Sequence, residues 1–184
     1  MNDDTTHNQT LPAAVVESPL GWVGIAVTTS GIRHATLFHP TRDAAERELR
    51  AYNGNLAVAS PLAAEACQRL RAYTAGAPDA LQDFPVDLPP KLPAPSRAVL
   101  LALRHVPPGQ TRTYGWLAET AGLGRTKARA AGAIIAANPV PLWLPCHRIV
   151  AADGTLHGYG GGLAMKRQLL QLEGALPPAL ATMP

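Results

Sequence analysis

Proline occupies five of the fourteen positions in "DFPVDLPPKLPAPS" (residues 83–96), and this density restricts the backbone more than anything else in the chain. Proline fixes its own φ, lacks an amide hydrogen and biases the preceding residue toward extended conformations. No helical or strand periodicity runs through the segment, so we expect an extended linker. The linker predicts two domains, residues 12–90 and 91–176, with short tails at 1–11 and 177–184.

The two predicted domains carry opposite charge. Residues 1–90 hold six Lys or Arg against ten Asp or Glu, which gives −4, whereas residues 91–184 hold ten against three, which gives +7. Neutralisation of phosphates supplies most of the sequence-independent affinity for nucleic acid, so the second half is the part suited to a polyanion. An ordinary basic surface is the alternative that charge alone leaves open.

The chain shows no targeting or membrane-spanning pattern. No run approaches the roughly eighteen apolar residues that a membrane span needs, and the first dozen residues are polar and acidic. Cys67 and Cys146 are far apart, which gives neither a disulfide framework nor a zinc-ligand pair. We therefore expect a cytoplasmic protein with two reduced thiols, associated with the nucleoid where it binds DNA.

Short apolar runs open the first domain. "AAVVES", "WVGIAVTT" and "IRHATLF" are separated by the turn signals "PLG" and "SG", which predicts three antiparallel strands. "TRDAAERELRAY" and "PLAAEACQRLRAYTAG" follow at helical spacing, the first with Thr41 as its N-cap. These elements predict an α+β domain, in which Cys67 is a small buried core residue.

The second domain begins with the amphipathic helix "SRAVLLALRHV" and continues with two more helical segments. "YGWLAETAG" and "RTKARAAGAIIAAN" are joined by a link that contains Gly122 and Gly124, the layout of a helix-turn-helix. Lys127 and Arg129 stand at the start of the second segment, followed by small residues that let a partner approach closely. DNA binding is one interpretation, and an ordinary helix pair is the other.

Cys146 stands in "LPCHRIV" between a proline and a histidine. Pro145 predicts an extended, preset backbone that places the thiol. The nucleophile of cysteine chemistry is the thiolate, and an ordinary pKa near ~8.5 leaves only a few per cent ionised at neutral pH, so a base is needed. His147 is the candidate, although neighbours on a strand point to opposite faces, and the pair therefore needs a bend or a bridging water.

A catalytic histidine is usually oriented by a carboxylate on its second nitrogen. The second half offers three acids, Glu119, Asp153 and Glu173. Glu173 ends the amphipathic "LAMKRQLLQLEG" just before Gly174, a position where the helix dipole disfavours an acid. We expect His147 to be the partner that holds it there, with a solvated surface glutamate as the alternative.

The glycine-rich "HGYGGGL" that follows can pass close to a planar ligand, to which Tyr159 would offer a ring face or a hydroxyl. A zinc deaminase site requires Pro-Cys-x-x-Cys, and Ile149 stands where the second cysteine would be. A cysteine protease would leave the basic half and the helix pair without a purpose.

Three stretches together resemble the methylated-DNA–protein-cysteine methyltransferases, the O6-alkylguanine-DNA alkyltransferases. They are "PGQTRTYGWLAETAG", "ARAAGAIIAANPVPLWLPCHRIV" and "GYGGGLAMKRQLLQLEG", and the resemblance covers residues 104–175. It implies a ribonuclease H-like first domain, built on the three-stranded antiparallel sheet and its helices. It also implies a winged-helix-like second domain. The second helix of the helix-turn-helix in this domain enters the minor groove of DNA.

The resemblance implies a role for individual residues. Cys146 matches the alkyl acceptor, His147 its water-bridged base, Glu173 the acid behind the histidine, and Asn138 the residue that braces the active-site turn. A further set matches residues that bind DNA and the flipped base: Tyr114, Arg129, Pro141, Arg148, Ile149, Tyr159 and Gly160. The implied partner is double-stranded DNA that contains O6-alkylguanine, bound by a monomer without a cofactor or a metal.

The expected reaction is DNA repair by direct transfer. A flipped O6-alkylguanine, with O4-alkylthymine as a possible minor substrate, gives its alkyl group irreversibly to Cys146, so one molecule repairs one lesion. Two other functions stay open. One is a lesion-binding protein that transfers nothing, and the other is a cysteine hydrolase that turns over esters or peptides and is indifferent to DNA.

Overall fold

The computed structural model describes residues 10–53 and 60–177, so the predicted tails lie almost wholly outside the described residues. None of the helices in these two ranges is long and apolar enough to cross a membrane. In chain order the helices and strands are β1 (Ala13–Ser18), β2 (Gly21–Val27), β3 (Ile32–Ala35), α1 (Arg42–Asn53), α2 (Pro61–Thr74), α3 (Ala94–Ala102), η1 (Leu103–His105), β4 (Arg112–Thr113), α4 (Tyr114–Thr120), η2 (Arg125–Lys127), α5 (Ala128–Ala136), η3 (Cys146–Arg148), β5 (Ile149–Val150) and α6 (Gly162–Leu172).

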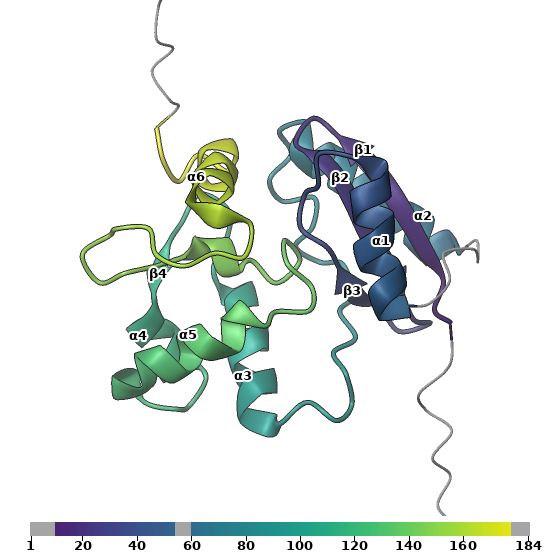
Figure 1. Ribbon diagram of the computed structural model, residues 1–184. Coiled ribbons are helices and arrows are strands. Elements are labelled where there is room, and N and C mark those ends of the chain that lie inside the picture. Colours follow the sequence, from purple (N-terminus) through teal and green to yellow (C-terminus); the bar gives the residue numbers. More distant parts are fainter. Residues whose placement is uncertain (1–9, 54–59, 178–184) are drawn as a thin grey trace, which may run out of the picture.

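The N-terminal half, described residues up to 90, is built on an antiparallel sheet in the order β1-β2-β3 (Figure 1). The register of β1 against β2 runs from the pair Ala13 and Ala26 to the pair Ser18 and Gly21. Gly21 adopts a φ of +122°, and a Cβ there would lie 2.5 Å from a backbone oxygen, so this turn requires glycine. The prediction of three antiparallel strands in an α+β fold is confirmed.

Helices α1 and α2 cover opposite faces of this sheet, and the side chains on these two faces differ in size. Val23, Ile25 and Val27 are fully buried and belong to the same core cluster as the apolar residues of α2. The other face presents Gly24 and Ala26, and a Cβ on Gly24 would stand 3.0 Å from Leu49 of α1. The small residues therefore let α1 approach the sheet closely, and Thr41 caps this helix with its side chain, as predicted.

The proline-rich segment is extended at residues 85–89, as predicted, but its last three residues form the start of α3, and it is not a free linker. Ile32 of β3 donates its N–H to the carbonyl of Pro85 at 2.9 Å, and Asp87 donates to the carbonyl of Ile32 at 2.9 Å. Phe84 is fully buried, and its ring centroid lies 6.3 Å from that of Trp143 in the C-terminal half. The two halves consequently share one continuous apolar core.

The C-terminal half, residues 91–177, packs α3, α4 and α5 together, and α6 lies against η3 at the other end of this half (Figure 1). Thr113 caps α4 by accepting from the N–H of Trp116 at 3.1 Å. Gly124, at a φ of +84°, belongs to the turn that joins α4 to η2 and α5. The predicted helix-turn-helix order of elements is therefore present. Strands β4 and β5 form a short parallel pair, which joins the start of this helix-turn-helix to the segment that follows Cys146.

Candidate active site

Cys146 lies at the start of the 3-10 turn η3, where the sequence had predicted extended backbone. The N–H of Cys146 donates to the carbonyl of Leu144 at 2.8 Å, and the N–H of Arg148 donates to that of Pro145 at 3.0 Å. These bonds close the turn, so the extended interpretation is wrong from Cys146 to Arg148. The turn supplies the bend that a cysteine and a neighbouring histidine need to serve one site.

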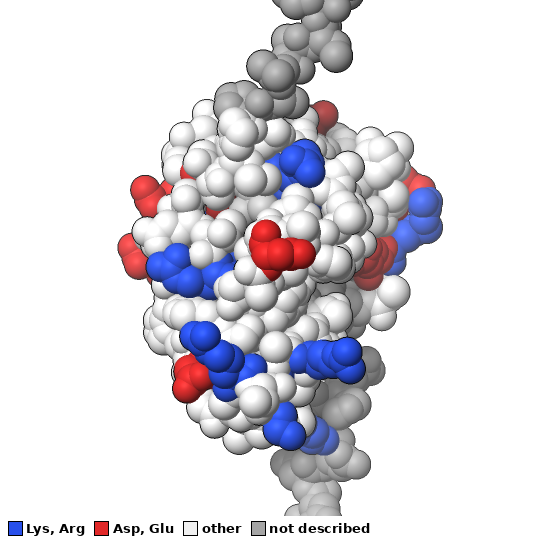
Figure 2. Space-filling view, turned by 90° about the vertical axis from the view of Figure 1, so that its left-hand side faces the viewer, with Lys and Arg blue, Asp and Glu red and all other residues white. Residues whose placement is uncertain are grey.

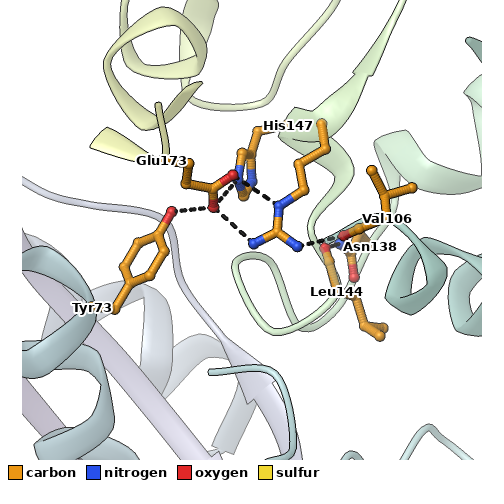
Figure 3. A network of polar contacts seen from close by, with 7 residues as sticks. Tyr73, Val106, Asn138, Leu144, His147 and Glu173 are labelled. Atoms are coloured by element: carbon orange, nitrogen blue, oxygen red, sulfur yellow. Dashed lines mark hydrogen bonds and ion pairs between the residues drawn. The ribbon is translucent and has the colours of Figure 1, made fainter. Parts of the chain in front are cut away.

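Asn138 braces the loop that precedes this turn (Figure 3). Its amide nitrogen donates to the carbonyl of Leu144 at 2.7 Å, and its amide oxygen accepts from the N–H of Val140 at 3.1 Å. Between these two contacts Leu142 adopts a φ of +76°, a conformation that costs a non-glycine residue about 1–3 kcal/mol and occurs often at functional sites. Asn138 thus holds a strained loop in the shape that presents Cys146.

His147 and Glu173 form a fully buried pair behind the cysteine. The Nε2 atom of His147 lies 2.9 Å from Oε1 of Glu173, and both side chains have 0% of their surface exposed. Burial alone would raise the pKa of Glu173, but the contacts with His147 and Arg148 outweigh it and lower the pKa to about 2. The expectation that Glu173 needs a partner is met by three side chains, those of His147, Arg148 and Tyr73.

The protonation state of His147 follows from these surroundings. Burial, together with the charges of Arg148 and Lys166, lowers the pKa of His147 against the opposing effect of Glu173, so the ring is neutral. Since Glu173 is ionised and can only accept hydrogen bonds, Nε2 of His147 carries the ring proton and donates a hydrogen bond to the carboxylate. The other ring nitrogen, Nδ1, is then an unprotonated acceptor, and it is buried without a hydrogen-bond partner. His147 is therefore set up to take a proton at Nδ1.

Two more donors complete the coordination of Glu173 (Figure 3). Arg148 reaches both carboxylate oxygens at 2.8 Å and also donates to the carbonyl of Val106 at 2.6 Å. Tyr73, from α2 in the N-terminal half, donates its hydroxyl to Oε1 at 2.8 Å. Burial raises the pKa of Tyr73 well above its ordinary value, which keeps the hydroxyl protonated. Arg148 and Tyr73 thus fix the carboxylate that orients His147.

Cys146 lines a cavity of about 740 Å³, with 8% of its own surface exposed. Burial raises the pKa of its thiol, while a hydrogen bond from Asn138 and the charge of Lys166 act in the opposite direction. The resting group is therefore the thiol. A nucleophilic thiolate forms only when a base such as His147 removes the proton.

Tyr159 and Tyr114 stand at the same cavity. The Tyr159 hydroxyl is buried without a hydrogen-bond partner, and its ring meets that of His147 edge-on, with 6.5 Å between the centroids. Burial raises the pKa of Tyr159, so the hydroxyl is an unused donor. Tyr114 donates to the carbonyl of His157 at 3.3 Å, and a Cβ on Gly132 would lie 3.5 Å from its ring.

The structure brings most of the sequence-predicted residues together. Arg129, Pro141 and Gly160 line the cavity with Cys146, Asn138, Tyr114 and Tyr159. His147 and Glu173 stand behind it as the buried pair. Arg148 and Ile149 do not line it, because Arg148 turns toward Glu173 and Ile149 is fully buried in β5.

Lys166 is a site residue that the sequence reasoning missed. Its Nζ donates to the carbonyls of Ile149 at 2.6 Å and His157 at 2.8 Å, and the residue is fully buried. Burial lowers its pKa to about 8 against the opposing effect of Cys146. A signal was present, since Lys166 shares one helical stripe of α6 with Leu169, Leu170 and Glu173, and a lysine on a buried stripe has a buried partner.

The face that carries α4 and α5 is basic. Arg125, Lys127 and Arg129 are exposed at η2 and the first turn of α5, next to exposed Ala130 and Ala133. Figure 2 shows Lys and Arg side chains gathered over the lower part of this face. Because the cavity lining includes Ala128, Arg129 and Gly132, it extends from the start of α5 to Cys146.

The chemistry available to this arrangement is narrow. A thiol and a free phenolic donor line a cavity large enough for a planar heterocycle, and a neutral imidazole backed by a carboxylate is buried behind it. Such a group can move a proton off the sulfur, attack an electrophilic carbon and donate a hydrogen bond to the departing group. A carbon transferred to the sulfur would be held by a thioether bond, which water does not cleave at neutral pH.

Comparisons with known proteins agree with this chemistry. Residues 94–175 match the family model of the 6-O-methylguanine DNA methyltransferase DNA-binding domain. A methylated-DNA–protein-cysteine methyltransferase of Methanosarcina acetivorans is 34% identical over 88% of this chain and 97% of its own length. The corresponding Mycolicibacterium paratuberculosis protein is 36% identical over 91% of this chain and 95% of its own.

A solved structure has the same architecture. The crystal structure of Mycobacterium tuberculosis OGT in complex with DNA matches this chain with a TM-score of 0.71 and 30% sequence identity. The match covers 90% of this chain and 94% of the other. Both halves of the molecule therefore have counterparts in that structure.

Proposed function

The chain belongs to the methylated-DNA–protein-cysteine methyltransferase family, and we propose on that basis that it repairs DNA by taking the alkyl group of O6-alkylguanine onto Cys146. The observation that carries the assignment of Cys146 is its position at the cavity, in front of a buried His147 whose Nδ1 is unpartnered. A buried nitrogen without a partner is unusual in a folded protein. Here it is the acceptor that the thiol proton requires.

The proposed reaction is one displacement. His147 takes the Sγ proton at Nδ1, directly or through one water, and Glu173 stabilises the imidazolium that forms. The thiolate attacks the alkyl carbon from the side opposite O6, the sulfur–carbon bond forms, and the carbon–oxygen bond breaks with its electron pair moving to guanine. Tyr159 donates a hydrogen bond to the departing base, and the proton held by His147 returns to guanine. The products are guanine and a thioether at Cys146.

The thioether ends the activity of the molecule. Thioethers are not cleaved by water at neutral pH, and no second thiol lines the described cavity. An alkyl group on Cys146 would also crowd a residue that has 8% of its surface exposed, and such overpacking typically costs about 1–3 kcal/mol. We infer that each molecule repairs one lesion and is less stable afterward. O4-alkylthymine is a candidate for a minor substrate, because its alkyl oxygen bond has the same chemistry.

DNA would bind at the basic face. Exposed Arg125, Lys127 and Arg129 can neutralise phosphates, and the small residues on α5 allow a duplex to approach the helix closely. A structural relative, Mycobacterium tuberculosis OGT, was crystallised in complex with DNA, which supports DNA binding by this chain. The target base must leave the duplex to reach Cys146, at a cost of a few kcal/mol that is lower for a damaged pair. Tyr114 and Arg129, at the cavity near α5, are the side chains we assign to this step.

Finer features of the architecture follow the same family. We infer a ribonuclease H-like domain at residues 12–90, supported by the sheet with helices on both faces. We infer a winged-helix-like domain at 91–176, supported by α4, α5 and the β4-β5 pair. We further propose that the protein acts as a monomer on chromosomal DNA in the cytoplasm.

The proposed function is tested by counting lesions. A fixed amount of protein is incubated with excess duplex oligonucleotide that contains O6-methylguanine, and the remaining lesion is measured by digestion and chromatography. We expect the lesion consumed to equal the protein added and then to stop. A protein that only binds lesions, or a cysteine hydrolase that acts on esters or peptides, would leave all of the O6-methylguanine intact, and an enzyme with multiple turnovers would continue past stoichiometry. Either result contradicts the proposal.

The assignment of Arg129 is tested by comparing two forms of the substrate. Arg129→Ala should slow repair of the duplex by about tenfold or more, the typical weight of one specific contact, but change the reaction with free O6-benzylguanine much less. The free base needs no extrusion and no phosphate contact. Equal losses on both substrates would show that Arg129 does not act on the duplex.

A further inference from the structure

The cavity in front of Cys146 has one wall that comes from the N-terminal half. His34, Ala35, Leu37 and Glu48 line it opposite the residues of the C-terminal half. None of the site residues expected from the sequence belongs to this half. The cavity is therefore closed by a part of the chain to which neither the sequence motifs nor the proposed chemistry assigns a role.

This wall is fastened to the active-site loop. Ala35, the last residue of β3, donates its N–H to the carbonyl of Pro139 at 2.9 Å. Pro139 lies between Asn138, which braces the loop, and Pro141, which lines the cavity. Since a backbone hydrogen bond joins the strand to this loop, the residues that follow β3 are held at a set distance from Cys146.

Leu37 is the residue of this wall that meets the opposite side. A Cβ built on Gly160 would lie 3.3 Å from Cδ1 of Leu37, closer than most real Cβ contacts. The isobutyl group therefore stands directly against the backbone of the glycine-rich loop, next to Tyr159. Leu37 narrows the cavity at the point where Gly160 leaves it open.

The rest of the wall is weakly polar. The His34 ring stacks on Tyr52, with 3.9 Å between centroids and 10° between planes, and neither of its ring nitrogens has a hydrogen-bond partner. Burial lowers the pKa of His34, although nearby Glu48 acts in the opposite direction, so the ring is neutral. Glu48 itself is paired with His39 at 2.7 Å. Apart from this paired carboxylate, the wall offers an aliphatic group and a neutral ring, which suit an apolar substituent.

We propose that Leu37 is a specificity-determining residue that limits the size of the O6 substituent able to react at Cys146. The inference rests on the proposed function. In a displacement in line with sulfur and O6, any group attached to the alkyl carbon must project sideways, toward the walls of the cavity. A volume of about 740 Å³ lies in the upper part of the range of ~300–1,000 Å³ for small-molecule sites, so the walls rather than the total space decide which substituent fits.

The test compares two lesions in one duplex sequence, O6-methylguanine and O6-benzylguanine, through the second-order rate constants for their consumption. Leu37→Ala should raise the ratio of the benzyl to the methyl rate constant about tenfold, the size typical of a few methylene groups in a pocket. Leu37→Trp should lower the same ratio by a similar factor. Leu101→Ala, at an exposed site on α3 outside the cavity, is the control and should leave the ratio unchanged.

A double-mutant cycle tests the contact itself. Gly160→Ala should slow benzyl transfer in the wild-type background, where its Cβ meets Leu37, and slow it much less in the Leu37→Ala background. Leu37→Met, which conserves volume, provides a second variant should Leu37→Ala or Leu37→Trp fold poorly, and it should stay near the wild-type ratio.

The outcomes separate this inference from the proposed function. A wild-type protein that consumes neither lesion would overturn both. A protein that consumes both lesions, but whose rate ratio stays within about twofold of wild type in Leu37→Ala and Leu37→Trp, would overturn the role of Leu37 alone. Equal effects of Gly160→Ala in the two backgrounds would have the same meaning.

Discussion

Cys67 and Cys146 are buried to nearly the same extent, with 7% and 8% of their surfaces exposed, and burial raises the pKa of both thiols. Cys67 lies in helix α2 among apolar core residues, and it does not line the cavity. Cys146 lies in a 3-10 turn with an unprotonated imidazole nitrogen behind it and a cavity in front. The comparison teaches that burial by itself makes a cysteine inert, and that a base and an opening make it a candidate nucleophile.

Replacing each cysteine in turn should give the largest contrast between the two regions. Cys146→Ala should abolish consumption of O6-methylguanine, because no other described thiol lines the cavity. Cys67→Ala should keep full stoichiometry while costing about 1 kcal/mol of unfolding free energy, the usual size of a small core change. The check is lesion consumption together with urea denaturation. Loss of activity in Cys67→Ala with the fold intact would contradict the assignment of Cys67 as a core residue without a role in the reaction.

Glu173→Gln should make the surroundings of Cys146 more like those of Cys67. The amide cannot stabilise an imidazolium, so transfer should slow by about 100-fold, within the range of general acid–base effects. Buried Arg148 would lose its counter-ion, and such a loss typically lowers the free energy of unfolding by about 3–5 kcal/mol. The rate of transfer is measured from reactions stopped at timed intervals, and the free energy of unfolding is measured by urea denaturation. A variant that transfers at the wild-type rate would remove Glu173 from the mechanism.

Acid should destabilise the region of Cys146 in particular. The pKa of Glu173 is lowered to about 2 from an ordinary 4.5, so its stabilising contribution is fully present above 4.5 and is lost as the pH falls toward 2. The difference between these two pKa values corresponds to roughly 3 kcal/mol of unfolding free energy. Urea denaturation between neutral pH and about pH 3 should therefore show a steeper loss in wild type than in Glu173→Gln. Cys67→Ala is the control and should keep the wild-type slope, and equal slopes in all three proteins would contradict this assignment.

Tyr73→Phe should have the smallest effect, and it tests a link between the two regions. Tyr73 and Cys67 share helix α2, yet the Tyr73 hydroxyl donates to Glu173. Removing one hydrogen bond to a charged group should cost about 1.5 kcal/mol of unfolding free energy. Arg148 continues to hold both carboxylate oxygens, so the loss should stay below that of Glu173→Gln in the same denaturation experiment. A loss as large as in Glu173→Gln would show that Tyr73, rather than Arg148, carries the network.

Local patterns in the sequence were sufficient for much of the fold. Alternation and turn signals predicted the three strands, and Thr41 marked the start of α1. The helix dipole argument at Glu173 predicted a partner, and the structure supplies His147 and Arg148. These features depend on neighbours within a few residues or on the chemistry of one group, which is why they can be inferred without coordinates.

Other features depend on contacts between distant segments. Tyr73 and Glu173 are 100 residues apart, and nothing near Tyr73 in the sequence marks it as a donor to the site. The 3-10 turn at Cys146 forms where Arg148 and His147 both turn toward one buried carboxylate, a demand that overrides the extended preference set by Pro145. The place of Leu37 in the cavity likewise depends on how β3 meets the loop at Pro139.

The most direct test of the difference between the two cysteines is peptide mapping by mass spectrometry after incubation with excess duplex that contains O6-methylguanine. The account predicts one methyl group per molecule, all of it on the peptide with Cys146 and none on the peptide with Cys67, with no further reaction afterward. Methylation of Cys67, or consumption of the lesion that leaves Cys146 unmodified, would contradict it.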